Sequence, residues 1–293
     1  MKNNKLAYLL IFIANIIFGL SFLFTKVSLA YTSPLILVAH RFILAFLIMN
    51  ILILFRIQKI AIKNKPIKKL ILLGLIQPVF YFIFETYGIE MTSSSFAGII
   101  LGLLPIFGSL CGAFFLKEEI KKSHVLLIFL SVLGIFFTTF MGEIKFSISG
   151  LILLLLAVLS AALFSTLSSF LSKEVSAFER TYTMFALGSI CFTIMALFSI
   201  NGNLSLFLEP LYNINYLKGL FYLGFLSSVV AFFFINYSLS KVSVSSQTLL
   251  SNFSTVVSIL GGVIFLHESF NLAQMIGIIL ILISVISISL LKH

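Results

Sequence analysis

Two side chains of opposite charge lie deep inside apolar stretches of this chain. Arg41 stands about 12 Å into a helix predicted over residues 33–55, and Glu85 stands about 9 Å from the end of the next predicted helix. A lone charge near the middle of a bilayer costs on the order of 3 kcal/mol, so we expect these two to form an ion pair, with His40 nearby. The pair is either a structural lock or a functional group in which Glu85 binds a proton or an amine and exchanges its partner with Arg41.

Amide side chains in the apolar stretches form a second set of candidates. An amide both donates and accepts hydrogen bonds, which suits contact with an uncharged or zwitterionic solute. Asn15, Gln77 and Asn252 fall near the middle of their predicted helices, and Asn236 is a further candidate. The alternative is hydrogen bonding between helices, worth about 0.6 kcal/mol for each amide. We favour that alternative for Gln247, which lies close to the end of its helix.

One stretch of the chain occurs twice, at residues 87–120 and again at residues 237–270. In both copies, steps of three and four residues mark a single stripe along a helix. The stripe is small in the first copy and polar in the second: Ser95, Gly98, Gly102, Pro105, Ser109 and Gly112, against Ser245, Thr248, Asn252, Thr255, Ile259 and Gly262. In a membrane such a stripe meets other helices or lines a polar cavity. We favour helix packing for the stripe as a whole and keep Pro105 and Thr255 as cavity candidates. Pro105 is either a hinge that exposes a backbone carbonyl to the cavity or a static kink.

Each copy ends on an acid, Glu118 in the first and Glu268 in the second. A carboxylate at the C-terminus of a helix gains nothing from the helix dipole, so another partner is expected, such as a neighbouring lysine or a loop amide. We interpret both acids as structural latches: Glu118 would tie the fourth predicted helix to the fifth, and Glu268 the ninth to the tenth. The sequence contains no HExxH, Gly-x-Ser-x-Gly or phosphate-loop motif, so we assign no catalytic residue, no metal ligand and no cofactor.

The composition places these residues in a membrane. The chain is 60% hydrophobic and 10% charged, with a mean hydropathy of +1.20, which is more apolar surface than one soluble core could bury. A membrane-spanning helix needs about 20 mostly apolar residues. That rule predicts an all-α, polytopic membrane protein with ten transmembrane helices, at residues 6–29, 33–55, 70–90, 93–116, 125–141, 150–171, 182–200, 219–237, 242–266 and 272–291.

The basic residues indicate the orientation of these helices. Of the 19 Lys and Arg residues, only Lys26, Lys145 and Lys218 fall on the side opposite the N-terminus, while Arg41 stays inside a span. By the positive-inside rule both chain ends are cytoplasmic. This distribution also explains the net charge of +10, so we expect no nucleic-acid partner; binding of the basic loop 56–69 to anionic membrane lipid is a secondary interpretation. Each half, 1–146 and 147–293, then holds five helices, and an odd number makes the halves inverted repeats.

Several short motifs, in a fixed order, resemble those of a known family. They are Phe18-Gly19, His40-Arg41-Phe42, Thr92-Ser93-Ser94-Ser95 leading to Pro105, Phe114 to Glu118, Phe164-Ser165, Asn236 to Leu239, and Phe265 to Glu268 followed by Gln274 and Gly277. Together they resemble the EamA family of the drug/metabolite transporter superfamily, over nearly the whole chain as two five-helix domains. The chain departs from the family in having no tryptophan. It also has Thr255 where a proline is common, so we expect the ninth helix to bend less than the fourth.

The resemblance implies a carrier of the bacterial inner membrane that moves a small metabolite by alternating access. It implies a central cavity lined by helices 1, 3, 4, 6, 8 and 9, with helices 5 and 10 at the periphery, and it adds Phe18 and Phe164 to the cavity candidates. An amino acid or related zwitterion suits a cavity with amides, one acid and one arginine, and efflux is the family tendency. The alternatives are a proton-coupled multidrug or nucleotide-sugar-type exchanger and, with less support, a membrane enzyme or a non-transporting scaffold. A homodimer stays open.

Overall fold

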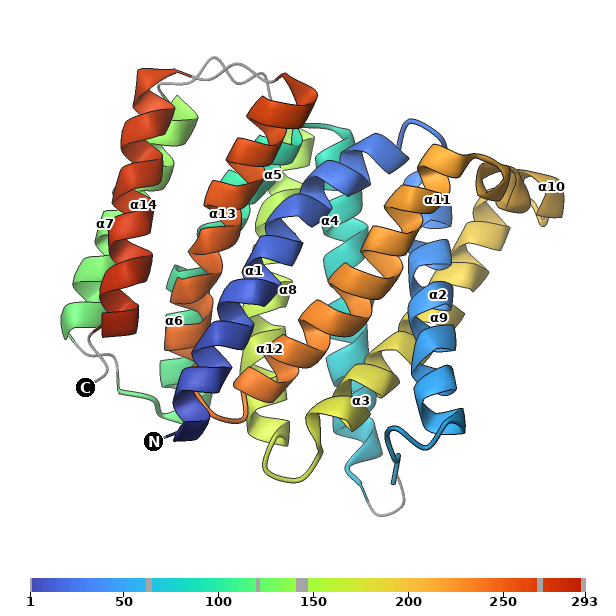
Figure 1. Ribbon diagram of the computed structural model, residues 1–293, viewed down its shortest axis with the longest axis horizontal. Coiled ribbons are helices and arrows are strands. Elements are labelled where there is room, and N and C mark those ends of the chain that lie inside the picture. The colour runs from blue at the N-terminus through green and yellow to red at the C-terminus, as the bar shows by residue number, and fades with distance from the viewer. Residues whose placement is uncertain (1, 62–64, 120–121, 141–146, 268–270, 291–293) are drawn as a thin grey trace.

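The computed structural model describes residues 2–61, 65–119, 122–140, 147–267 and 271–290, and within these ranges it contains helices and no strand. In the described ranges the helices form ten long segments, and Figure 1 shows how they cross the molecule. In chain order the helices are α1 (Lys2–Ser28), α2 (Pro34–Leu54), α3 (Ile67–Gly74), η1 (Leu75–Phe80), α4 (Tyr81–Glu90), α5 (Ser94–Leu101), α6 (Leu104–Leu116), α7 (Lys122–Phe140), α8 (Ile148–Leu171), α9 (Ala177–Ser199), α10 (Leu204–Leu208), η2 (Glu209–Tyr212), α11 (Ile214–Phe221), η3 (Tyr222–Ala231), α12 (Phe232–Ser238), α13 (Val244–Leu266) and α14 (Leu272–Leu290). Eight of the segments are long and apolar enough to span a membrane, by length and composition alone, and the apolar parts of α7 and α14 are shorter. The predicted all-α architecture is confirmed.

Serine side chains start four of the long segments. The hydroxyl oxygens of Ser93, Ser147, Ser176 and Ser243 each accept a hydrogen bond from the backbone N–H three residues later, at 3.0 to 3.3 Å. These bonds satisfy N–H groups that the first turn of a helix leaves unpaired, which matters most where little water is available. The sequence therefore fixes the beginnings of α5, α8, α9 and α13 locally.

Two of the crossing segments are broken near their middle. The third segment, which we expected to be one helix, breaks at Gln77, whose backbone is extended (φ −147°, ψ 117°). Pro78 follows it, and a proline disfavours helical geometry in the residue before it. The fourth segment breaks between α5 and α6, with Pro105 in the first turn of α6, where a missing N–H costs no hydrogen bond. In contrast α13 is continuous through Thr255, in agreement with the expectation that the ninth helix bends less.

The two halves of the chain are related by an approximate twofold arrangement. Helix α1 packs on α13 and on η3 and α12, and its counterpart α8 packs on α5 and α6 and on η1 and α4. Three further pairs join equivalent segments of the two halves: α2 with α9, α5 and α6 with α13, and α7 with α14. The α7 and α14 pair lies side by side at one edge of the bundle (Figure 1). This exchange of contacts is the geometry of inverted repeats.

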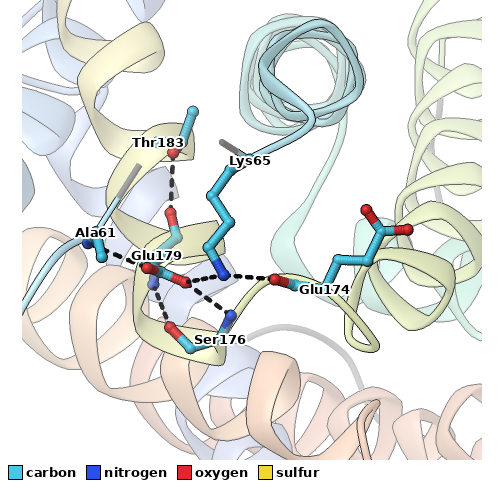
Figure 2. A network of polar contacts seen from close by, with 6 residues as sticks. All are labelled: Ala61, Lys65, Glu174, Ser176, Glu179 and Thr183. Atoms are coloured by element: carbon cyan, nitrogen blue, oxygen red, sulfur yellow. Dashed lines mark hydrogen bonds and ion pairs between the residues drawn. The ribbon is translucent and has the colours of Figure 1, made fainter. Parts of the chain in front are cut away.

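A polar network joins two loops at the end of the molecule where α1 begins (Figures 1 and 2). The Glu179 carboxylate accepts hydrogen bonds from the backbone N–H groups of Ala61 and Ser176, at 3.1 and 2.9 Å, and lies 3.8 Å from the Lys65 ammonium. Lys65 also donates to the backbone oxygen of Glu174 at 2.6 Å. The network therefore connects the chain after α2 to the start of α9.

Candidate functional site

A cavity lies between the two halves of the bundle and encloses about 80 Å³ of space open to a water-sized molecule. A buried water needs about 10–15 Å³ by this measure, so the cavity has room for several. Its wall is formed by Asn15, Phe18, Ser21, Phe22, Arg41, Gln77, Tyr81, Phe82, Glu85, Leu101, Leu104, Ala161, Phe164, Ser165, Phe232, Ile235, Gln247, Ser251 and Ser254. These residues come from the six segments that the family resemblance implies, with Arg41 of α2 in addition. Among them are six of the predicted candidates: Asn15, Phe18, Gln77, Phe164, Arg41 and Glu85.

The two charged residues face this cavity but do not form the direct ion pair that we expected. Arg41 donates from Nε to Ser228 Oγ and from Nη2 to Ser227 Oγ, both at 2.9 Å, and its guanidinium lies 4.3 Å from the centre of the Phe82 ring. The Glu85 carboxylate accepts a hydrogen bond from Thr86 at 3.2 Å. In the part of the chain that the structure describes, the ion pair within 4.0 Å is Lys65 with Glu179.

The physical reason for this difference is the position of η3. Two consecutive serines on η3 reach the guanidinium and satisfy part of its hydrogen-bonding capacity without a carboxylate. Arg41 and Glu85 are both almost completely buried, and they still interact electrostatically at longer range. The cavity therefore has a cation and an acid in its wall that are not in contact with each other.

Two glutamines add polar atoms that have no partner. The side-chain oxygens of Gln77 and Gln247 are buried and accept no hydrogen bond from the described residues, although both side chains line the cavity. An unpaired buried acceptor costs about 1–3 kcal/mol, so each oxygen is available to accept a hydrogen bond from a donor that enters the cavity. Asn15 differs, because its amide nitrogen donates to the Ile11 carbonyl of its own helix at 2.8 Å.

Aromatic rings form the apolar part of the wall. Phe18 and Phe164, from the first segment of each half, both pack edge-on against Phe232, at 5.2 and 6.0 Å between ring centres. These are the two positions that the family resemblance added to the candidates. The wall therefore combines an apolar aromatic surface with a few polar groups, which is the usual composition of a small-molecule pocket.

Four predicted cavity candidates lie outside this wall, and three of them form hydrogen bonds to other helices. Asn236 donates to Thr181 and accepts from Ser168, while Asn252 donates to Ser131 of α7 at 2.9 Å. Thr255 donates to the Gly98 carbonyl at 2.8 Å, and Pro105 is buried in the first turn of α6, a helix that packs on α8 and α13. In this conformation these residues therefore contribute to contacts between helices, which was the alternative interpretation. The stripe of small residues is a packing face.

His40 points away from the cavity. Its Nδ1 lies 2.8 Å from the Tyr216 hydroxyl, and its ring packs edge-on against Phe207 at 4.6 Å. Both partners belong to the region between α9 and η3, so His40 anchors that region to α2. This placement separates His40 from the Glu85 carboxylate with which we had grouped it.

Glu118 has backbone partners on a different helix from the expected one. Its two carboxylate oxygens accept from the N–H groups of Val244 and Ser245, at 2.9 and 3.3 Å. Glu118 therefore ties the end of α6 to the start of α13, the ninth segment, rather than to α7, because the exposed N–H groups of a helix start attract a carboxylate. Glu268 lies outside the described residues.

Sequence reasoning did not predict Ser251 and Ser254 in the wall, and it favoured contact between helices for Gln247, whose side chain lines the cavity. Gln247, Ser251 and Ser254 line the cavity from α13, and their spacing of four and three residues puts them on one face of a helix. That stripe is visible in the sequence, next to the one that packs on α5 and α6. The extended backbone at Gln77 also had a visible signal, the proline that follows it.

Comparison with known proteins extends these observations. The model of the EamA-like transporter family matches the chain twice, over residues 5–140 and 148–290. The uncharacterized transporter YcxC of Bacillus subtilis is 33% identical over 285 residues, which covers 96% of this chain and 91% of that protein. An uncharacterized transporter of Archaeoglobus fulgidus is 27% identical over 271 residues, 91% of this chain and 92% of that protein. A crystal structure has the same fold with a TM-score of 0.75 at 19% identity, over 97% of this chain and 98% of that chain.

The family model matches each half of the chain once, which agrees with the equivalent helix contacts that the two halves make with each other. The cavity lies where the two matched regions meet, and its wall takes residues from each. We conclude that this is a multi-pass membrane transporter and that the chain belongs to the EamA-like transporter family.

Proposed function

We propose that this protein is a secondary transporter that exports an amino acid or a related zwitterion across the cell membrane by alternating access. The observation that carries the proposal is the unpaired placement of Arg41 and Glu85 in the wall of one cavity. Intramembrane charges are costly and are retained mainly where they serve a function. A bound zwitterion would form ion pairs with both residues at once, with its carboxylate toward Arg41 and its ammonium toward Glu85.

The hydrogen-bonding capacity of the wall supports a solute of this class. A guanidinium has five N–H donors, and the serines of η3 take two of those on Arg41. The remaining donors would bind a carboxylate, while the free oxygens of Gln77 and Gln247 would accept from an ammonium. The rings of Phe18, Phe164 and Phe232 would contact an apolar side chain.

The proposed cycle moves the two halves, 1–146 and 147–293, relative to each other about the cavity. The distribution of Lys and Arg supports a topology with both chain ends in the cytoplasm. In that topology the Glu118 contact with α13 closes the cytoplasmic end. At the outer end of α1, Lys26 donates to the backbone oxygens of Ile89, Glu90 and Thr92, at 2.6 to 3.1 Å. Contacts at the two ends would open alternately.

The test is counterflow in vesicles that contain the purified full chain. Vesicles are preloaded with one unlabelled amino acid, and the uptake of the labelled compound is measured, after a thermal-shift screen has selected the compound. Arg41→Gln and Glu85→Gln should each lower transport about tenfold or more, since removing one charge of a buried recognition pair costs at least about 1.4 kcal/mol. Arg56→Gln, in an exposed loop, is the matched control.

Analogues of the solute separate the two roles. Arg41→Gln should reduce transport of the amino acid but not of the decarboxylated amine, and Glu85→Gln should spare the deaminated acid. The proposal fails if both variants transport the amino acid like the unaltered protein. It also fails if neither variant distinguishes the amino acid from its analogues.

A further inference from the structure

A second hollow, separate from the central cavity, opens on the membrane-facing surface of the bundle. It is an apolar groove of about 340 Å³, lined by Leu72, Ile76, Phe115, Leu116, Leu163, Thr166, Leu167 and Phe170. Helix α8 contacts both α3 and α6, and the groove lies along these three helices, with Ile76 of η1 in addition. Leu72, Phe115 and Phe170 are exposed. In a bilayer this groove would be in contact with acyl chains.

Each of the three helices that line the groove carries a lysine at the same end of the molecule. Lys69 lies in the first turn of α3, Lys117 directly follows α6, and Lys173 lies two residues beyond α8. All three side chains are exposed. The Lys69 ammonium lies 4.7 Å from the centre of the Phe170 ring, which is part of the groove. Positive charge is therefore held directly at one end of an apolar surface.

The other charged groups at this end leave the three lysines available. Lys65 is engaged with Glu179 and with the Glu174 backbone oxygen, as Figure 2 shows. The Glu118 carboxylate accepts from the α13 backbone. Glu119 and Glu174 are exposed acids in the same two loops, so the three lysines exceed the acids by one, and Lys68 beside Lys69 adds a further positive charge.

We propose that this groove and its lysines form a binding site for an anionic phospholipid of the cytoplasmic leaflet. One acyl chain would lie in the groove over α8, and the phosphate would lie among Lys69, Lys117 and Lys173. A basic residue near an anionic membrane surface contributes on the order of 1 kcal/mol. The apolar groove contributes contact area but no preference for one headgroup over another, so the lysines determine the selectivity.

The test uses the absence of tryptophan from the chain. Phe115→Trp places a single fluorescent reporter in the groove, and Leu72→Trp is a second reporter there in case the first variant does not fold. Leu54→Trp, at the same end of α2 and 76% exposed, is the matched reporter outside the groove. Each full-length variant is placed in phosphatidylcholine vesicles that contain a small fraction of either brominated phosphatidylglycerol or brominated phosphatidylcholine, and quenching is compared.

We expect the groove reporters to give about a fivefold higher relative affinity for phosphatidylglycerol than for phosphatidylcholine. The preference should fall to about one when Lys69, Lys117 and Lys173 are all changed to Gln, and should not change with Lys218→Gln at the opposite end. Equal quenching by the two lipids at both groove positions would overturn the proposal. So would an equal preference at Leu54→Trp, because general surface charge would then explain it.

Discussion

The contact between Glu118 and the first turn of α13 should determine how readily the cavity opens at this end, which we propose to be the cytoplasmic end. A hydrogen bond to a charged group contributes about 1.5 kcal/mol at the lower end of its range, and Glu118 accepts two. Glu118→Gln keeps one neutral bond of about 1 kcal/mol, so the loss is about 2 kcal/mol before screening. Solvent at this half-buried site halves the loss to about 1 kcal/mol, which is about a fivefold change in the closed-to-open ratio.

The assay is the alkylation rate of a cysteine in the cavity wall. Ser165→Cys places the reporter on α8, away from the altered contact, after Cys111 and Cys191 have been changed to Ala. A membrane-impermeant maleimide is added on the side of the basic loop 56–69. Glu118→Gln should raise the rate about fivefold, because the reporter is reached only when the cytoplasmic end is open.

Glu119→Gln is the control, since this neighbouring side chain is exposed and has the same charge. It should leave the rate unchanged. A Glu118→Gln protein with a lower melting temperature but an unchanged alkylation rate would refute the reasoning, because the contact would then stabilise the fold equally in both states.

Three further predictions concern packing and binding. Gly98→Ala should lower the melting temperature strongly, since a Cβ there would overlap the Ser258 side chain, whose Cβ would be 2.7 Å away. Adding Ser258→Gly should restore part of the loss. Gly261→Ala, whose nearest neighbour would be 3.6 Å away, should have little effect. Arg180→Gln should destabilise the detergent-purified protein by about 3 kcal/mol, because this fully buried guanidinium donates to oxygens of α8 and α12 and each hydrogen bond from a charged group contributes about 1.5 kcal/mol or more. The measurement is thermal unfolding, and an unchanged melting temperature would contradict this. Gln77→Leu should raise the KM for the transported solute about fivefold, the equivalent of about 1 kcal/mol, and a KM within twofold of the unaltered protein would mean that its free oxygen does not bind the solute.

The crossing segments and their inverted arrangement were predictable from the sequence, because both depend on hydropathy and loop charge averaged over many residues. Breaks in the segments depend on single residues. The kink near Pro105 was expected and the break at Gln77 was not, although Pro78 carries the same kind of signal. The start of α9 also differs from the predicted one, at residue 182, because a local cap determines it. The helix begins at Ala177, directly after the capping residue Ser176.

The partners of individual polar side chains were less predictable. Arg41 and Glu85 reach similar depths, which is why a pair was expected, but depth does not give the rotation of each helix about its axis. Ser227 and Ser228, 186 and 187 residues later in the chain, occupy the guanidinium instead. Glu118 likewise bonds to backbone atoms 126 residues away, and sequence periodicity contains no information on such a contact.

The unbroken α13 has a consequence for energetics. Its counterpart in the first half is divided into α5 and α6, so the proposed rocking motion would deform two mechanically different elements that both cross the bundle and pack on each other. In the proposed cycle we therefore expect the inward-facing and outward-facing forms to differ in free energy, even without a solute or an ion gradient. We expect one orientation to predominate at rest, with the proline-containing element bending more than the continuous helix during each turnover.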